Sequence, residues 1–228
     1  MGISVYKISR KFVYSRCLLA MISHAVMINK FPDLSYEQSW DGCNYSINNE
    51  SCKATITFQK NICVGAIRNY GSHQISGENI FEQLTVDFPE NVQNLLKDEA
   101  LQYLLEDVEG KVISVVSSVF WCDDKNLYFS SVYSESKRND IDQMLPYLTK
   151  FKKSLEHWVD YFEIDKHNKS LCLSLYRKKL GNFEKDIYLN KKQLQKIPPI
   201  EFYDEEESCQ NAISNECIEA LKEVGIYI

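Results

Sequence analysis

Residues 111–133, KVISVVSSVFWCDDKNLYFSSVY, contain two β-prone runs on either side of a polar turn. The first run extends from Lys111 to Trp121 and the second from Leu127 to Tyr133, and residues 123–126 separate them. Runs rich in Val, Ile, Phe, Tyr and Trp that are joined by a short Asp/Asn turn are typical of an antiparallel hairpin. Because apolar residues point to both faces of the first run, we expect an interior strand that is covered on both sides.

Helical patterns flank this hairpin. Apolar residues at three- and four-residue spacing predict helices over residues 8–29, 92–108 and 141–162. Asn139 is placed to cap the last of these helices. Pro146 predicts a bend or a restart within it, so that a start near Leu145 is the alternative.

The remaining strands are expected before the hairpin. Residues 54–58 alternate between apolar and polar side chains, Lys60-Asn61 forms a two-residue turn, and residues 62–67 return as the second strand. An earlier strand is expected within residues 40–47. These elements predict an α+β fold, with an antiparallel or mixed sheet of five to seven strands packed by long amphipathic helices on one or both faces.

The C-terminal part begins with an ambiguous segment. Residues 169–180 alternate like a strand, but Asn168 as a cap and Gly181 after a group of cations favour a short helix. A short strand at 186–189, a brief helix capped by Asn190 and a helix over 213–224 should follow, and the chain end could dock as a strand. We expect one α+β domain over residues 1–200, with residues 201–228 forming an acidic linker and a helix packed on the same domain.

Charge is distributed unevenly along the chain, whose net charge is −6. Residues 61–136 contain twelve acidic and four basic side chains, residues 137–200 contain fourteen basic and eight acidic, and residues 201–228 contain eight acidic and one basic. An acidic total disfavours binding to phosphate backbones. The basic block at 137–200 is interpreted as a solvated helix face, with a patch that touches RNA as the alternative.

The cysteines and the N-terminus indicate a cytoplasmic protein. None of the eight cysteines form a Cys-x-x-Cys pair, so reduced and mostly buried thiols are expected. The apolar run over residues 17–28 is too short to span a bilayer and lacks a cleavage site. The four histidines show no metal-binding spacing, and we expect no metal and no cofactor.

Signatures of common catalytic sites are missing. The chain has eight glycines but no P-loop, no dinucleotide-binding fingerprint and no nucleophile elbow. The triplet Glu109-Gly110-Lys111, with Asp87 as a distant partner, matches the Glu-x-Lys pattern of some nucleases. Its glycine favours a turn at this position.

Two segments are candidates for binding a partner. The first contains Trp40, Asp41 and Tyr45, whose residue types are enriched at binding hot spots; the alternative is that Trp40 enters the core while Asp41-Gly42 turns the chain. The second is an aromatic-acidic run that could meet a basic partner; the alternative is a solvated linker. It consists of Phe202, Tyr203, Asp204, Glu205, Glu206 and Glu207.

The leading functional hypothesis is a non-enzymatic intracellular protein that recognises and inhibits another protein, as an immunity protein does against a toxin or nuclease. We expect a protein partner, no membrane and no nucleic acid. The alternative is a hydrolase or nuclease whose carboxylates converge only in three dimensions; its candidate residues are Asp41, Glu109, Asp123, Asp124 and His157. A structural subunit with a broad apolar patch is a third possibility.

Overall fold

A computed structural model describes residues 3–71, 80–131, 134–182, 184–200 and 212–228, with the side chains of 134–139 left out. The chain divides into two compact units. Unit 1 comprises residues 1–14 and 41–148, and unit 2 comprises residues 15–40 and 149–228. The fold is α+β, as predicted.

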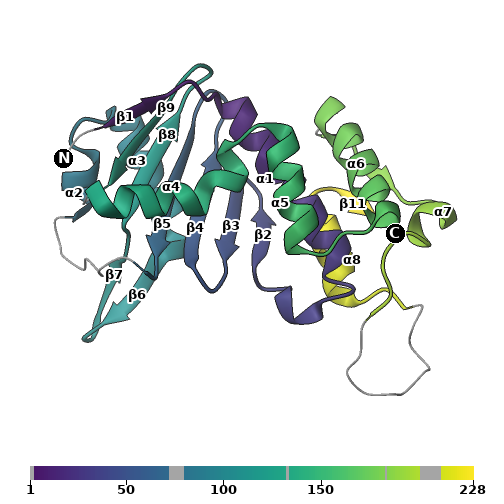
Figure 1. Ribbon diagram of the computed structural model, residues 1–228. Coiled ribbons are helices and arrows are strands. Elements are labelled where there is room, and N and C mark those ends of the chain that lie inside the picture. Colours follow the sequence, from purple (N-terminus) through teal and green to yellow (C-terminus); the bar gives the residue numbers. More distant parts are fainter. Residues whose placement is uncertain (1–2, 72–79, 132–133, 183, 201–211) are drawn as a thin grey trace. The chain divides into compact units, whose positions relative to one another are not determined.

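The main sheet has seven strands in the order β1-β9-β8-β5-β4-β3-β2 (Figure 1). The strands are β1 (Ser4–Tyr6), β2 (Gln38–Asp41), β3 (Asn44–Asn48), β4 (Cys52–Phe58), β5 (Cys63–Asn69), β8 (Ser118–Cys122) and β9 (Leu127–Ser131). The predicted hairpin over residues 54–67 is confirmed as β4 and β5, which are antiparallel. The strand expected within residues 40–47 is two strands, because Gly42 takes a left-handed φ of 57° and turns the chain between them.

The central hairpin is confirmed in its second half and corrected in its first. β8 pairs with both β5 and β9, so it is an interior strand. Residues 111–114 instead form β7 (Lys111–Ser114), which pairs only with β6 (Leu105–Val108) in a separate ribbon, and Val112 is 69% exposed. Glu109 and Gly110 both adopt positive φ angles, and this tight turn gives residues 111–114 a local partner.

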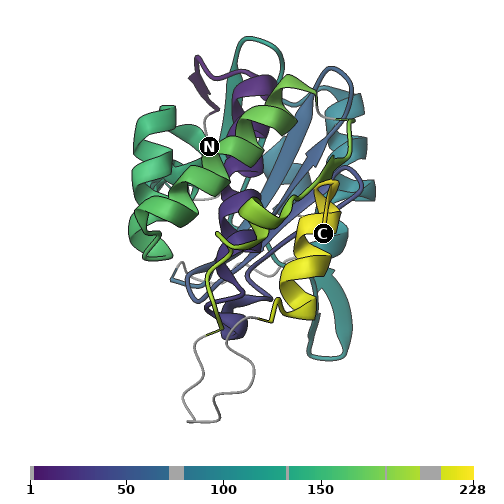
Figure 2. The same ribbon diagram turned by 90° about the vertical axis from the view of Figure 1, so that its right-hand side faces the viewer.

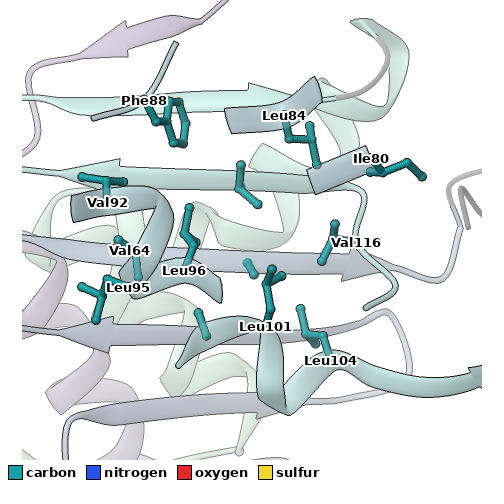
Figure 3. Close-up of a cluster of buried hydrophobic side chains, with 13 residues drawn as sticks. Val64, Ile80, Leu84, Phe88, Val92, Leu95, Leu96, Leu101, Leu104 and Val116 are labelled. Carbon is teal, nitrogen blue, oxygen red and sulfur yellow. The ribbon is translucent and has the colours of Figure 1, made fainter. Parts of the chain in front are cut away.

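One face of the sheet is covered by α2 (Ile80–Thr85), α3 (Glu90–Asp98) and the 3-10 helix η2 (Ala100–Leu104). Their apolar side chains pack on Val64, Ala66 and Val119 of the sheet, as Figure 3 shows for the labelled members of this cluster. The single helix predicted over residues 92–108 is wrong beyond Asp98. Glu99 has φ −122° and ψ −74°. Because these angles are not helical, α3 ends before Glu99, and η2 and β6 follow.

The opposite face of the sheet is crossed by α4 (Ser134–Leu148) (Figure 1). The helix predicted over residues 141–162 is two helices, α4 and α5 (Phe151–Tyr161), because Lys150 has an extended ψ of 149°. Pro146 lies in the last turn of α4, and α4 begins before the expected cap at Asn139. The helix therefore restarts after Pro146, at Phe151, six residues later than the alternative start near Leu145.

Unit 2 is built on α1 (Arg10–Met27), the helix predicted over residues 8–29 (Figure 2). Every residue from 17 to 28 is buried, which is typical of a core helix. The Arg16 guanidinium donates to the Thr149 carbonyl and to the Tyr176 hydroxyl and lies over the Phe151 ring. Arg16 thereby joins α1 to α5 and to α6 (Lys166–Gly181).

The C-terminal elements agree with their predictions. Residues 169–180 are helical, in α6, although its N-cap is Asp165 and not Asn168. Asn190 and Gln193 form a capping box at α7 (Lys191–Leu194). After α8 (Asn215–Glu223), β11 (Ile226–Tyr227) docks in parallel on β10 (Ile187–Tyr188). The predicted boundary at residue 200 stays a prediction.

None of the helices in the described part of the chain is both long enough and apolar enough to cross a membrane.

Candidate functional site

The turn between β2 and β3 exposes the acidic residue that the sequence singled out. Asp41, Gly42 and Cys43 are all exposed at this turn. Gly42 has a positive φ, so the chain reverses its direction tightly between Asp41, the last residue of β2, and the start of β3. The Asp41 carboxylate accepts a hydrogen bond from the Tyr103 hydroxyl of η2 at 3.3 Å. The turn is therefore joined to the helical layer of unit 1.

A buried amide extends this contact into a network. The Asn44 side chain donates to the Glu99 carboxylate and to the Tyr103 hydroxyl, each at 3.3 Å. Its carbonyl oxygen accepts from the Thr57 hydroxyl at 2.5 Å. Asn44 is 6% exposed, and its bonds hold the Glu99 carboxylate directly and Asp41 through the Tyr103 hydroxyl. We call Asp41, Cys43, Asn44, Glu99 and Tyr103 the carboxylate–tyrosine cluster.

The carboxylates of the cluster change the acidity of their neighbours. Burial, followed by the charges of Glu99 and Asp41, raises the pKa of the Cys43 thiol. Burial also raises the pKa of Tyr103, and the Asn44 hydrogen bond opposes this shift while Asp41 and Glu99 add to it. A thiol with a raised pKa is a poor nucleophile at neutral pH. The arrangement is therefore better suited to accept hydrogen bonds from a cation than to attack a substrate.

The layer that carries Glu99 and Tyr103 is acidic on its outer side. Residues 80–104 contain five carboxylates and a single basic residue, Lys97. The buried apolar residues of α2 and α3 face the sheet, so the exposed residues lie on the side away from it. Val86 is 73% exposed on this layer. We call this surface the acidic helical face; its carboxylates are Glu82, Asp87, Glu90, Asp98 and Glu99.

No family model, curated protein or solved structure matches this chain. The function must therefore be argued from the residues themselves.

The other two residues of the first predicted binding segment are buried. Trp40 is 4% exposed, and its backbone N–H donates to the Glu223 carboxylate at 2.6 Å. Tyr45 is fully buried, and its hydroxyl donates to the Tyr147 hydroxyl at 3.4 Å. Both side chains contribute to packing in the interior. A role for them in binding a partner stays a prediction, and Asp41 is the exposed member of the three.

The second predicted binding segment lies outside the described residues. This applies to all six of its members, Phe202, Tyr203, Asp204, Glu205, Glu206 and Glu207.

The four carboxylates of the hydrolase alternative lie in three separate turns, because only Asp123 and Asp124 share one. The Asp123 carboxylate accepts the backbone N–H groups of Lys125 and Asn126 in its own turn, at 2.7 Å each. Strands β5, β4 and β3 separate β8 from β2, so Asp41 lies on the order of 19 Å from the Asp123 turn. Glu109 lies at the tip of the β6–β7 ribbon, and His157 is in unit 2 on α5. Across the described ranges, no three His, Cys, Asp or Glu side chains are placed to hold one metal ion.

A second polar cluster of unit 1 is buried between α4 and the sheet. The Ser118 hydroxyl of β8 donates a hydrogen bond to the Asp140 carboxyl of α4, and Asp140 is completely buried. Burial raises the pKa of Asp140, and hydrogen bonds from Ser118, Ser117 and Asn69 oppose the shift. No sequence pattern indicates this cluster, because Asp140 and its partners come from segments far apart in the chain.

Proposed function

We propose that this protein is a non-enzymatic intracellular binding protein that recognises and inhibits another protein, and that the partner is a basic toxin or nuclease. The observation that carries the proposal is the acidic helical face, which adjoins the carboxylate–tyrosine cluster. Unit 1 contains 16 acidic and 11 basic residues, and five of the acidic ones lie within residues 80–104. The net charge of this unit is therefore −5, out of −6 for the whole chain.

The chemistry of the cluster suits a cationic side chain. An Arg or Lys of the partner can donate to Asp41 and Glu99 and can lie against the half-buried Tyr103 ring. The Asn44 bonds already fix Glu99 and Tyr103, so less conformational entropy is lost on binding. The surrounding carboxylates would raise the association rate with a basic protein.

The acidic run from Asp204 to Glu207 is proposed to add to this surface charge. Its four carboxylates follow two aromatic residues, which are able to contact apolar parts of the same partner. This part of the proposal rests on the sequence alone.

The test is capture of a partner with matched charge variants. The tagged wild-type chain is incubated with a lysate of its native cell, next to a triple variant Asp41→Asn, Glu90→Gln, Asp98→Asn. A partner that binds the acidic helical face should be enriched by the wild type and lost with the triple variant. After purification, its affinity should fall at least tenfold in that variant, should weaken as salt increases, and its toxic or nuclease activity should be inhibited by the wild type.

The control neutralises three exposed carboxylates of α5 and its C-terminus in unit 2, by Glu156→Gln, Asp160→Asn and Glu163→Gln. This control variant removes as many charges as the triple variant, and it should still capture the partner. A second variant that neutralises Asp204 to Glu207 measures the contribution of that run. Equal capture by the wild type and the triple variant, or a captured protein whose activity is unaffected, would refute the proposal.

A further inference from the structure

Two cysteines face each other across the central strands of unit 1. Cys63 is the first residue of β5, Cys122 is the last residue of β8, and the two are directly paired in the antiparallel register. Their Sγ atoms lie 2.9 Å apart, closer than two sulfur atoms in ordinary contact. All seven described cysteines are thiols. This pair is therefore a dithiol already positioned across two strands.

The pair is buried, but it lies beside two turns. Both side chains are completely buried. Each lies at the end of its strand, next to the turn over residues 59–62 or the turn over residues 123–126. Turns and strand ends open locally far more often than a whole domain unfolds. A small oxidant is able to reach the sulfurs during such an opening.

We propose that Cys63 and Cys122 form a reversible disulfide when the protein meets a hydroperoxide. The thiolate of one cysteine attacks the peroxide and breaks its O–O bond, giving a sulfenic acid and, with hydrogen peroxide as the oxidant, one water. The second sulfur then attacks the sulfenic sulfur. The S–S bond forms, the S–O bond breaks, and the hydroxide leaves as water with the proton of the second thiol. Two thiols lose two electrons and one peroxide is reduced.

The disulfide would act on a large part of unit 1. It closes a loop of 60 residues that contains α2, α3, η2 and the β6–β7 ribbon. Closing a loop of this length restricts the unfolded chain, so the oxidised protein should melt roughly 5–10 °C higher than the reduced protein. The modification would thus stabilise the unit that carries the acidic helical face without changing its surface charges.

The experiment treats the reduced full-length protein with hydrogen peroxide, blocks the remaining thiols under denaturing conditions and identifies cross-linked peptides by mass spectrometry. The expected result is a peptide pair that joins Cys63 to Cys122 and a higher melting temperature. Dithiothreitol should reverse both. Recovery of both cysteines as blocked thiols, or their conversion to sulfinic acid without a cross-link, would overturn the proposal.

Variants separate this pair from the other cysteines. Cys63→Ala and Cys122→Ala should each abolish the cross-link and the change in melting temperature. Cys172→Ala removes another buried thiol, from α6 of unit 2. This variant should still form the cross-link and should still show the change in melting temperature. Cys43→Ser removes an exposed thiol, and this variant should still form the cross-link. The peptide map of the wild type decides the proposal even where an alanine variant folds poorly.

Discussion

Gly65 lies in the middle of β5, where a side chain would collide with the core. A Cβ atom built at this position would be 2.2 Å from two ring atoms of Phe120, its partner on β8. Phe120 stacks on Phe129 with parallel rings, so it has little freedom to move away. We expect Gly65→Ala to destabilise the protein by about 2–3 kcal/mol, measured by urea unfolding.

The matched change is Gly181→Ala, because a Cβ at the end of α6 meets no atom within 4 Å. This variant should lie within about 0.5 kcal/mol of the wild type. Combining Gly65→Ala with Phe120→Leu should recover part of the loss, because a smaller side chain relieves the overlap. A Gly65→Ala variant as stable as Gly181→Ala would show that the contact with Phe120 does not limit this position.

Asp140 makes stability depend on pH in a direction that the structure fixes. Burial raises the pKa of Asp140 in the folded chain above its unfolded value of about 3.9. The protonated carboxyl therefore favours folding below the unfolded pKa, and this contribution is lost as the pH rises through the folded pKa. At pH 7 the Asp140→Asn variant should be more stable than the wild type by on the order of 1 kcal/mol.

The measurement is the free energy of unfolding in urea from pH 4 to pH 8. The advantage of Asp140→Asn should shrink as the pH falls toward 4, because the wild-type carboxyl then becomes neutral. Asp142→Asn changes an exposed carboxylate of the same helix and should show no such trend. If Asp140→Asn were more stable than the wild type by the same amount at pH 4 and at pH 8, burial of the Asp140 carboxylate would not be the cause.

At the scale of elements, α6 depends on a single cap. The Asp165 carboxylate accepts the backbone N–H groups of His167 and Asn168 at 2.6 and 2.8 Å. We expect Asp165→Ala to destabilise the protein by about 1 kcal/mol in urea unfolding, because two N–H groups of the first turn lose their acceptor. Asp165→Asn retains an acceptor oxygen and should lose less than half as much. Equal losses would indicate that the charge, and not the cap, stabilises α6.

Sequence patterns predicted the elements whose signals are local. The hairpin over residues 54–67 and the helices α1, α6 and α8 follow from periodicity and turn residues within each segment. The predictions are wrong where a contact between distant segments, or a single backbone angle, determines the secondary structure. Residues 111–114 have the composition of a buried strand, but the turn at Glu109-Gly110 pairs them with β6. The change of direction at Glu99 has no sequence signature that we can identify.

The candidate site was predictable only in part for the same reason. Asp41 is visible in the sequence because Asp-Gly is a strong turn signal. Tyr103, which donates to Asp41, and Glu99, which accepts from Asn44, are more than 50 positions away and were assigned to one long helix. Asn44 lies between Asp41 and Tyr45 of the first predicted binding segment, but its bridging bonds exist only after β3, β4 and η2 assemble.

At the scale of the whole molecule, the two units differ in how their charges are arranged. Unit 1 has a net charge of −5, concentrated in the helical layer. Unit 2 has a net charge of −1, because the basic residues of 149–200 are offset by the acidic residues of 201–228. The sequence showed these charge blocks, but not that the chain leaves unit 1 at residue 15 and returns at residue 41.

This discontinuous path makes a prediction about fragments. Deleting residues 149–228 removes most of unit 2. It leaves residues 17–27 of α1, which are buried throughout in the intact chain, without α5, α6 and α8 of their own unit. We expect the fragment 1–148 to bind the dye ANS and to be poorly soluble, because a long apolar helix becomes exposed. Co-expression with residues 149–228 should restore solubility and suppress dye binding, since both halves of unit 2 are then present. A fragment 1–148 that unfolds cooperatively in urea and binds no dye would contradict the assignment of α1 to the core of unit 2.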